Sequence, residues 1–152
     1  GGEATLHPLA PLCEEIKKLG FKIKLDTNGS NPSQIATLLE NKLIDFIALD
    51  YKAPKSKFST ITHAKLYDNF SQTLDFLITG NYPFEVRTTL HDDLLDVCDI
   101  NEMIEDLYQR GYTKTYYIQQ FLDTKTTISN LHSPTKKLNK SQLSKSIKIE
   151  FR

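Results

Sequence analysis

Four stretches of the chain have the apolar and polar spacing of β-strands. Residues 21–25 alternate apolar and polar side chains before a polar turn, and residues 45–50 form a mainly apolar run. Residues 84–90 carry a polar side chain at every second position, and residues 114–121 form a fourth, aromatic-rich strand. The first two strands both end in Leu-Asp followed by polar groups. This repeated pattern predicts a parallel sheet with chemically active side chains at the carboxyl ends of its strands.

Helical spacing separates these strands. Apolar side chains recur every three or four positions in residues 8–19, in a helix that begins at Asn31-Pro32, in residues 63–79 and in a helix that we expect Asp99 to cap. Residues 54–61 are expected to form a loop or short turn. Beyond residue 123 the chain is rich in Thr, Ser, Asn and Lys, and it predicts a short helix at 139–144 and an edge strand at 147–151.

The alternation of helices and strands predicts an α/β fold with parallel strands and right-handed crossovers. About four strands within roughly 120 residues fit either part of a β/α barrel or a small doubly wound sheet. We divide the chain into a domain of residues 1–122 and a C-terminal extension of residues 123–152.

Composition excludes several classes of function. The chain has 152 residues, with 19 basic and 19 acidic side chains, so no net charge favours nucleic acid or an anionic membrane as partner. No apolar run approaches the ~20 residues of a membrane-spanning helix, and no signal peptide is recognisable. Two cysteines, Cys13 and Cys98, make no disulfide framework, which favours a cytoplasmic location.

The beginning of the chain is unusual. It starts at Gly1 rather than Met, and Gly1-Gly2-Glu3 already has the form of a loop that follows a strand. We therefore interpret the chain as a piece of a longer protein, truncated at its N-terminus.

Polar side chains follow the strands at the predicted edge. Asp26, Thr27 and Asn28 come directly after the first strand, and Asp50 and Lys52 share one face of the extended segment after the second. Carboxylates suit hydroxyl groups and an ammonium suits a carboxylate or phosphate. The two glycines let a ligand approach the backbone closely.

Two further residues, one within the third strand and one directly after it, are candidates. Arg87 lies within the third strand, where it is expected to face a polar interior that contains an anion. His91 follows the end of that strand. No two histidines have metal-ligand spacing, and no Ser-His-Asp group, phosphate-binding loop or zinc motif can be assembled.

Five ordered motifs together resemble one family. They are Gly-Gly-Glu-Ala-Thr at 1–5, Lys-Leu-Asp-Thr-Asn-Gly at 24–29, Ala-Leu-Asp-Tyr-Lys-Ala-Pro at 48–54, Phe-Glu-Val-Arg-Thr-Thr at 84–89 and Tyr-Ile-Gln-Gln-Phe at 117–121. Over residues 1–122 the chain looks like the radical S-adenosylmethionine (SAM) enzymes that activate glycyl-radical enzymes. Within them it is most similar to activating proteins of anaerobic ribonucleoside-triphosphate reductase, relatives of the pyruvate formate-lyase activating enzymes.

The resemblance implies a partial β/α barrel and a set of SAM contacts. Gly1 and Gly2, followed by Glu3, match the motif that hydrogen-bonds the SAM amino group. The family positions that contact the SAM ribose and methionine carboxylate correspond here to Asp26, Thr27, Asn28, Asp50 and Lys52. Arg87 matches a strand residue that faces the same cavity.

The resemblance also implies cofactors, a reaction and partners. A 4Fe-4S cluster reduces SAM, and the resulting 5′-deoxyadenosyl radical removes a hydrogen atom from a glycine of the partner enzyme. The partner that the resemblance implies is an anaerobic ribonucleotide reductase. A flavodoxin or ferredoxin would supply the electron.

The chain departs from the family at two points. Ala4 stands where the family has Pro, and the CxxxCxxC loop that binds the cluster is absent. We expect those cysteines upstream of Gly1, so no metal ligand and no catalytic residue is assigned here. The fragment is expected to be inactive and to self-associate through exposed edges.

Three alternatives stay open. One is another radical SAM enzyme, such as a deazaguanine synthase. Another is a lyase that forms a Schiff base on Lys24 or Lys52, provided that burial lowers the lysine pKa. The third is a non-catalytic module that binds a nucleotide or docks a partner.

Overall fold

The computed structural model describes residues 2–121, 134–135 and 137–152. Its elements are η1 (Ala4–Leu6), α1 (Ala10–Lys18), β1 (Lys24–Thr27), α2 (Pro32–Glu40), β2 (Phe46–Asp50), α3 (Phe58–Thr62), α4 (Tyr67–Thr79), β3 (Phe84–Leu90), α5 (Val97–Gln109), β4 (Tyr116–Gln120), η2 (Lys140–Gln142) and β5 (Ile149–Phe151).

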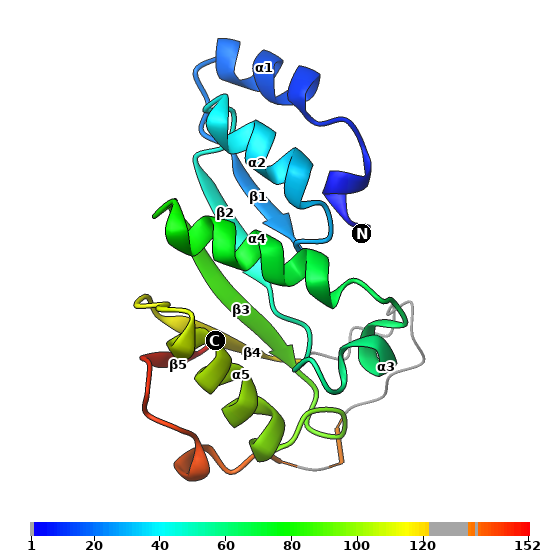
Figure 1. Ribbon diagram of the computed structural model, residues 1–152, viewed down its shortest axis with the longest axis vertical. Helices are drawn as coiled ribbons and strands as arrows, with labels where there is room; N and C mark the ends of the chain where they lie inside the picture. Colours follow the sequence, from blue (N-terminus) through cyan, green and yellow to red (C-terminus); the bar gives the residue numbers. More distant parts are fainter. Residues whose placement is uncertain (1, 122–133, 136) are drawn as a thin grey trace.

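The five strands form one parallel sheet in the order β1-β2-β3-β4-β5. Because each strand lies beside its predecessor, right-handed crossovers place the helices on one face, as in β/α barrels and unlike the doubly wound sheets. Figure 1 shows α2, α4 and α5 along that face. The predicted α/β partial barrel is therefore confirmed, with five strands among the described residues where about four were expected.

The two faces of the sheet differ in chemistry, as the alternation in sequence predicts. Ile47, Val86 and Ile118 face the helices and are fully buried. The opposite face carries polar side chains in register, since Asp50 pairs with Arg87 and Arg87 with Tyr117 on neighbouring strands. This polar face leads to the carboxyl ends of the strands, where the N-terminal segment and α3 also lie (Figure 1).

Two predictions about the region after β2 are wrong. The expected loop at 54–61 contains the short helix α3, and the helix expected from residue 63 begins at Tyr67. His63, in the left-handed conformation with φ 54°, ends α3. The second helix therefore starts only after this turn.

The cap of α5 was also assigned wrongly. Asp96 is the N-cap residue, and its side chain accepts a hydrogen bond from the Asp99 amide at 3.0 Å. Asp99 instead accepts from the Asp96 amide at 2.8 Å, which completes a capping box. The predicted cap of α2 is confirmed, because Asn31 accepts from the Gln34 amide.

The start of the chain is less buried than its apolar pattern suggests. Strand β1 begins at Lys24 rather than residue 21, and Phe21 is 62% exposed. Cys13 on α1 is buried, whereas Leu12 and Leu19 of the same predicted stripe are exposed. These side chains lie at the edge of the sheet, because β1 is an edge strand among the described residues.

The C-terminal extension joins the same sheet through β5. The helix expected at 139–144 is the shorter 3-10 helix η2, and the edge strand expected at 147–151 is confirmed as β5. The proposed boundary between residues 122 and 123 lies outside the described residues. Among the described helices, none combines the length and apolar character that a bilayer crossing requires.

Candidate functional site

A polar cavity of about 370 Å³ lies at the carboxyl ends of β1 and β2. Its lining residues are Gly2, Glu3, Asp26, Thr27, Asn28, Asp50 and Lys52. Three separate segments thus bring most of the predicted site residues together. Arg87 reaches the same group through ion pairs, and Gly1 lies outside the described residues.

Glu3 ties the N-terminal segment to the end of β1. Its carboxylate accepts hydrogen bonds from the Thr27 hydroxyl at 2.6 Å and from the Asn28 amide at 2.7 Å. It also accepts from the amide and the hydroxyl of Thr5. Burial alone would raise the pKa of Glu3, but these hydrogen bonds outweigh it and lower the pKa. Glu3 is therefore an ionised positioning group, with its oxygens already used inside the protein.

Arg87 joins two carboxylates across three strands. Its Nε donates to Asp50 at 2.5 Å and its Nη2 donates to Asp26 at 2.9 Å. Lys52 donates to the second oxygen of Asp50 at 2.9 Å. Burial would lower the pKa of Arg87, but the pairing with Asp50 and Asp26 raises it. The result is a compact group of two acids and two bases, which can exchange partners with a zwitterionic ligand.

A tight turn presents the residues after β1. The Gly29 amide donates to the Thr27 hydroxyl at 3.1 Å, and the Ser30 amide donates to the Asn28 side chain at 2.9 Å. Gly29 has φ +73°, and a Cβ there would lie 2.9 Å from Leu49 Cδ1. The Thr73 hydroxyl on α4 donates a hydrogen bond to the Gly29 carbonyl at 2.8 Å and so fixes the turn. Sequence reasoning missed Thr73, because a single Thr in a helical pattern gives no signal.

Gly2 has no packing reason to be glycine. A Cβ added there would meet no atom within 4 Å, yet the residue lines the polar cavity. The missing side chain leaves the backbone of Gly2 open to a ligand.

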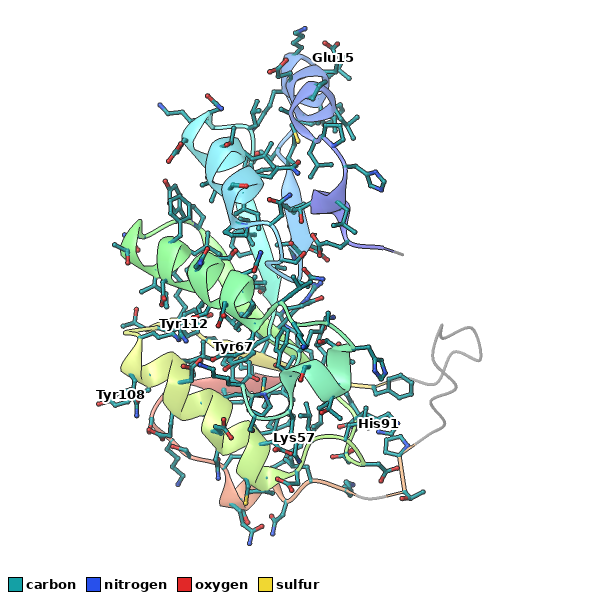
Figure 2. All side chains as sticks on the ribbon, turned by 45° about the vertical axis from the view of Figure 1, so that its right-hand side comes forward. Glu15, Lys57, Tyr67, His91, Tyr108 and Tyr112 are labelled. Carbon is teal, nitrogen blue, oxygen red and sulfur yellow. The ribbon has the colours of Figure 1, made fainter. Side chains whose placement is uncertain are left out.

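His91 lies apart from this cavity. It is 6% exposed, its ring packs against Phe121 at 4.9 Å, and its neighbour Asp92 accepts hydrogen bonds from Gln120 and from the Leu138 amide. Figure 2 labels it at the same end of the molecule as Lys57. The surroundings of His91 thus connect β3, β4 and the C-terminal extension.

The described residues do not fit a metal cluster. No three His, Cys, Asp or Glu side chains among them could hold a metal ion. Cys13 is buried on α1 and Cys98 is exposed on α5, so the two thiols belong to different elements. A 4Fe-4S cluster needs cysteine thiolates held together, which this part of the protein does not provide.

The surroundings of the two candidate lysines do not favour a Schiff base. The Lys52 side chain is 40% exposed and paired with Asp50, and the Lys24 side chain is 49% exposed and 3.4 Å from Glu85. A lysine that forms a Schiff base is typically desolvated in an apolar pocket or lies beside another cation, and neither side chain has such surroundings.

The chain is similar in sequence to a longer known protein. No protein-family model matches the chain. Over 128 residues the chain is 31% identical to a protein of Methanocaldococcus jannaschii described as a "putative glycyl-radical enzyme activating enzyme". The match covers 80% of this chain and 52% of that protein, so the chain spans about half the length of the relative.

A solved structure matches the whole fold. It is a domain of pyruvate-formate lyase-activating enzyme from Bacteroides vulgatus, with a TM-score of 0.74 and 15% sequence identity, and the match covers 100% of this chain and 95% of that one. The chain therefore has the α/β fold of that domain, and in sequence it is similar to a protein described as an activator of glycyl-radical enzymes.

Proposed function

We propose that this chain is the SAM-binding part of an activating enzyme for a glycyl-radical enzyme. One observation carries the proposal: open glycine backbone, three carboxylates and an ammonium all line one cavity of about 370 Å³. The similarity to the M. jannaschii protein supports the reaction class, and the sequence motifs support the cofactor.

SAM needs this mixture of groups, because it combines an ammonium, a carboxylate, a sulfonium and a ribose diol. Asp26 and Asp50 would accept hydrogen bonds from the ribose hydroxyls, and Lys52 and Arg87 would pair with the methionine carboxylate. The complete set that we assign to the SAM site is Gly1, Gly2, Glu3, Asp26, Thr27, Asn28, Asp50, Lys52 and Arg87, in which Glu3 acts by positioning Thr27 and Asn28.

SAM bound beside a reduced 4Fe-4S cluster supplies a 5′-deoxyadenosyl radical for hydrogen abstraction from a glycine. The residues of this chain bind and orient SAM, and the cluster needs ligands from elsewhere. We propose that these are cysteines upstream of Gly1, so the chain by itself is inactive.

The partner that we propose is an anaerobic ribonucleotide reductase, with a flavodoxin or ferredoxin as electron donor, in the cytoplasm. This assignment follows the resemblance of the five ordered motifs within residues 1–121. Another radical SAM enzyme, such as a deazaguanine synthase, is the alternative, because these motifs serve SAM more than the substrate.

The first test uses the full-length protein reconstituted anaerobically with iron and sulfide. After addition of dithionite and SAM, chromatography should detect 5′-deoxyadenosine, and replacement of the upstream cysteines by Ala should abolish it. A loaded cluster that gives no 5′-deoxyadenosine would reject the proposal.

Calorimetric titration with SAM tests the site itself. Asp50→Asn and Lys52→Met should each weaken SAM binding about tenfold or more, since each removes a charged hydrogen-bonding partner. The matched control is Lys18→Met, which removes an exposed ion pair on α1 and should change the affinity less than about twofold. Equal effects of all three variants would contradict the assignment.

A second candidate function is a non-catalytic nucleotide-binding module. The same polar cavity supports it, because carboxylates and an ammonium suit the hydroxyl and phosphate groups of a nucleotide as well as SAM. It predicts that the full-length protein binds SAM or a nucleotide without taking up iron.

A further inference from the structure

A second cavity, of about 290 Å³, adjoins the polar one. The two cavities share Asn28 and Lys52 in their linings. The rest of the second cavity is formed mainly by α3 and the turn after it, through Phe58, Ile61, Ala64 and Leu66. We call this cavity the α3 pocket.

The wall of the α3 pocket is held in place by aromatic packing. Phe58 is 4% exposed, and its ring lies 5.4 Å from that of Tyr67 and 6.1 Å from that of Phe70. Tyr67, labelled in Figure 2, thus anchors α3 to the start of α4. These contacts fix the base of α3 and leave Ile61 to face the cavity.

The turn after α3 is also ordered. The Thr62 hydroxyl donates to the Phe58 carbonyl at 2.6 Å and accepts from the Ala64 amide at 3.3 Å. His63 adopts the left-handed conformation, which reverses the chain and brings Ala64 and Leu66 back to the cavity. These contacts hold the turn that lines the pocket.

The chemistry of the α3 pocket differs from that of its neighbour. Among the described residues, Lys52 is the only charged one in its lining, and it is already paired with Asp50 at 2.9 Å. Leu66 is 37% exposed, so apolar surface here lacks cover. An occupant must be uncharged and apolar where it meets α3.

We propose that the α3 pocket binds an apolar side chain that flanks the reacting glycine of the partner polypeptide. This inference rests on the proposed function. A glycine has no side chain by which to be positioned, yet its Cα must come within about 3–3.5 Å of the reacting group. The neighbouring residue has its Cα only about 3.8 Å away, so its side chain reaches a cavity next to the SAM site.

The geometry meets that requirement. Asn28 and Lys52 form the boundary between the two cavities, so a polypeptide that presents its glycine at the polar cavity places the adjacent side chain against Ile61 and Leu66. The α3 pocket then determines specificity through the residue beside the glycine.

The test uses the full-length, reconstituted protein saturated with S-adenosylhomocysteine. Two acetylated and amidated pentapeptides are titrated, Ser-Leu-Gly-Leu-Ser and Ser-Ser-Gly-Ser-Ser. The wild type should bind the leucine peptide at least tenfold more tightly. Ala64→Leu, which fills the pocket, should remove this preference and leave the affinity for S-adenosylhomocysteine within about twofold.

Two further variants control for folding. Leu66→Ser should reduce the preference without adding bulk, and Leu94→Ser, at a similarly exposed leucine outside both cavities, should leave it unchanged. In isotope-labelled protein, the Ile61 methyl resonances should shift with the leucine peptide and not with adenosine.

Different results separate the possible errors. If Ala64→Leu weakens S-adenosylhomocysteine binding, or adenosine shifts Ile61, the pocket holds the nucleoside base and the inference is wrong. A wild type without preference for the leucine peptide also overturns it. If the wild type binds no S-adenosylhomocysteine, the proposed function itself fails.

Discussion

Arg87 and Asp50 form the closest ion pair of the candidate site, with Nε of the guanidinium 2.5 Å from Oδ1 of the carboxylate. The two residues are register partners on β3 and β2. Their side chains are only 17% and 22% exposed, so the pair is largely shielded from water. Because Arg87 also holds Asp26, it keeps two carboxylates of neighbouring strands at fixed positions.

Replacement of Arg87 by Met should therefore weaken both binding and stability. Asp50 would lose its shielded partner and keep only Lys52, while Asp26 would keep only the more distant Lys24. The free energy of unfolding should fall by about 2 kcal/mol, less than for a fully buried pair. SAM affinity should fall about tenfold or more. Urea denaturation and calorimetric titration measure the two effects.

Arg87→Lys is the matched control. It keeps the charge but not the planar fork that serves two carboxylates, so it should recover part of the stability and little of the affinity. Full recovery of both by Lys would show that the charge alone matters.

Glu3 should make stability depend on pH in the acid range. Its pKa is lowered from 4.5 by folding, so its contribution is complete above about pH 4.5 and is lost as the pH falls through the lower folded pKa. Glu3→Gln should cost about 1–2 kcal/mol at pH 7 and much less at pH 3. Urea denaturation at several pH values gives the difference between the two proteins.

The corresponding control is Glu15→Gln, at an exposed pair on α1. Its unfolding free energy should follow the wild type at every pH. A constant gap between wild type and Glu3→Gln across the range would mean that the charge of Glu3 is not what holds the N-terminal segment.

Gly29 and Gly20 offer a matched pair for the turn after β1. Both have positive φ, +73° and +83°, but a Cβ at Gly29 would lie 2.9 Å from Leu49 whereas one at Gly20 meets open space. Gly20→Ala should cost about 1 kcal/mol of conformational strain, and Gly29→Ala about 2–4 kcal/mol because a clash adds to the strain. Equal losses in urea denaturation would argue against the close packing of this turn on Leu49.

Most of the candidate site was predictable because the carboxyl ends of parallel strands lie at the same edge of the sheet. Two Leu-Asp strand ends had to meet, since carboxyl ends of parallel strands share an edge, and the alternation in β3 put Arg87 on their polar face. The helix α3 was not predictable in the same way. Its sequence, Phe-Ser-Thr-Ile-Thr, holds only two apolar residues, and tertiary packing on Tyr67 and Phe70 stabilises it.

The role of Glu3 was also beyond sequence reasoning. A carboxylate after two glycines looks like a ligand group, and only the structure shows that its oxygens are occupied by the protein. Likewise, the apolar stripe of α1 predicted a buried face, but burial depends on neighbours that a stripe does not specify. Cys13 is buried by neighbouring residues, whereas Leu12 is exposed.

The exposed apolar side chains near the N-terminus predict self-association of this chain. Leu6, Leu12, Leu19 and Phe21 are 72%, 58%, 73% and 62% exposed, and β1 beside them is an edge strand among the described residues. Sedimentation velocity should show oligomers at high concentration, and Leu12→Ser with Phe21→Ser should reduce them. Tyr108→Ser, at a residue 56% exposed on α5, is the control and should leave the distribution unchanged.

Glu85 connects the C-terminal extension to the polar face of the sheet. Glu85 is 9% exposed, and its carboxylate lies 3.4 Å from both Lys24 and Arg152. Arg152 also stacks on Tyr117, with its guanidinium 3.4 Å from the ring centroid. A double-mutant cycle with Glu85→Gln and Arg152→Met should give a coupling energy of about 0.5–1 kcal/mol, since Arg152 is half exposed and the contacts are long.

The same cycle distinguishes charge pairing from stacking. Arg152→Lys keeps the charge but loses the planar contact with Tyr117, so it should retain most of the coupling to Glu85 while lowering the unfolding free energy by an amount of its own. If Lys loses the coupling entirely, the position of Arg152 on Tyr117 controls the ion pair. If Met shows no coupling, Glu85 is stabilised by Lys24 alone and β5 is held by its backbone hydrogen bonds to β4.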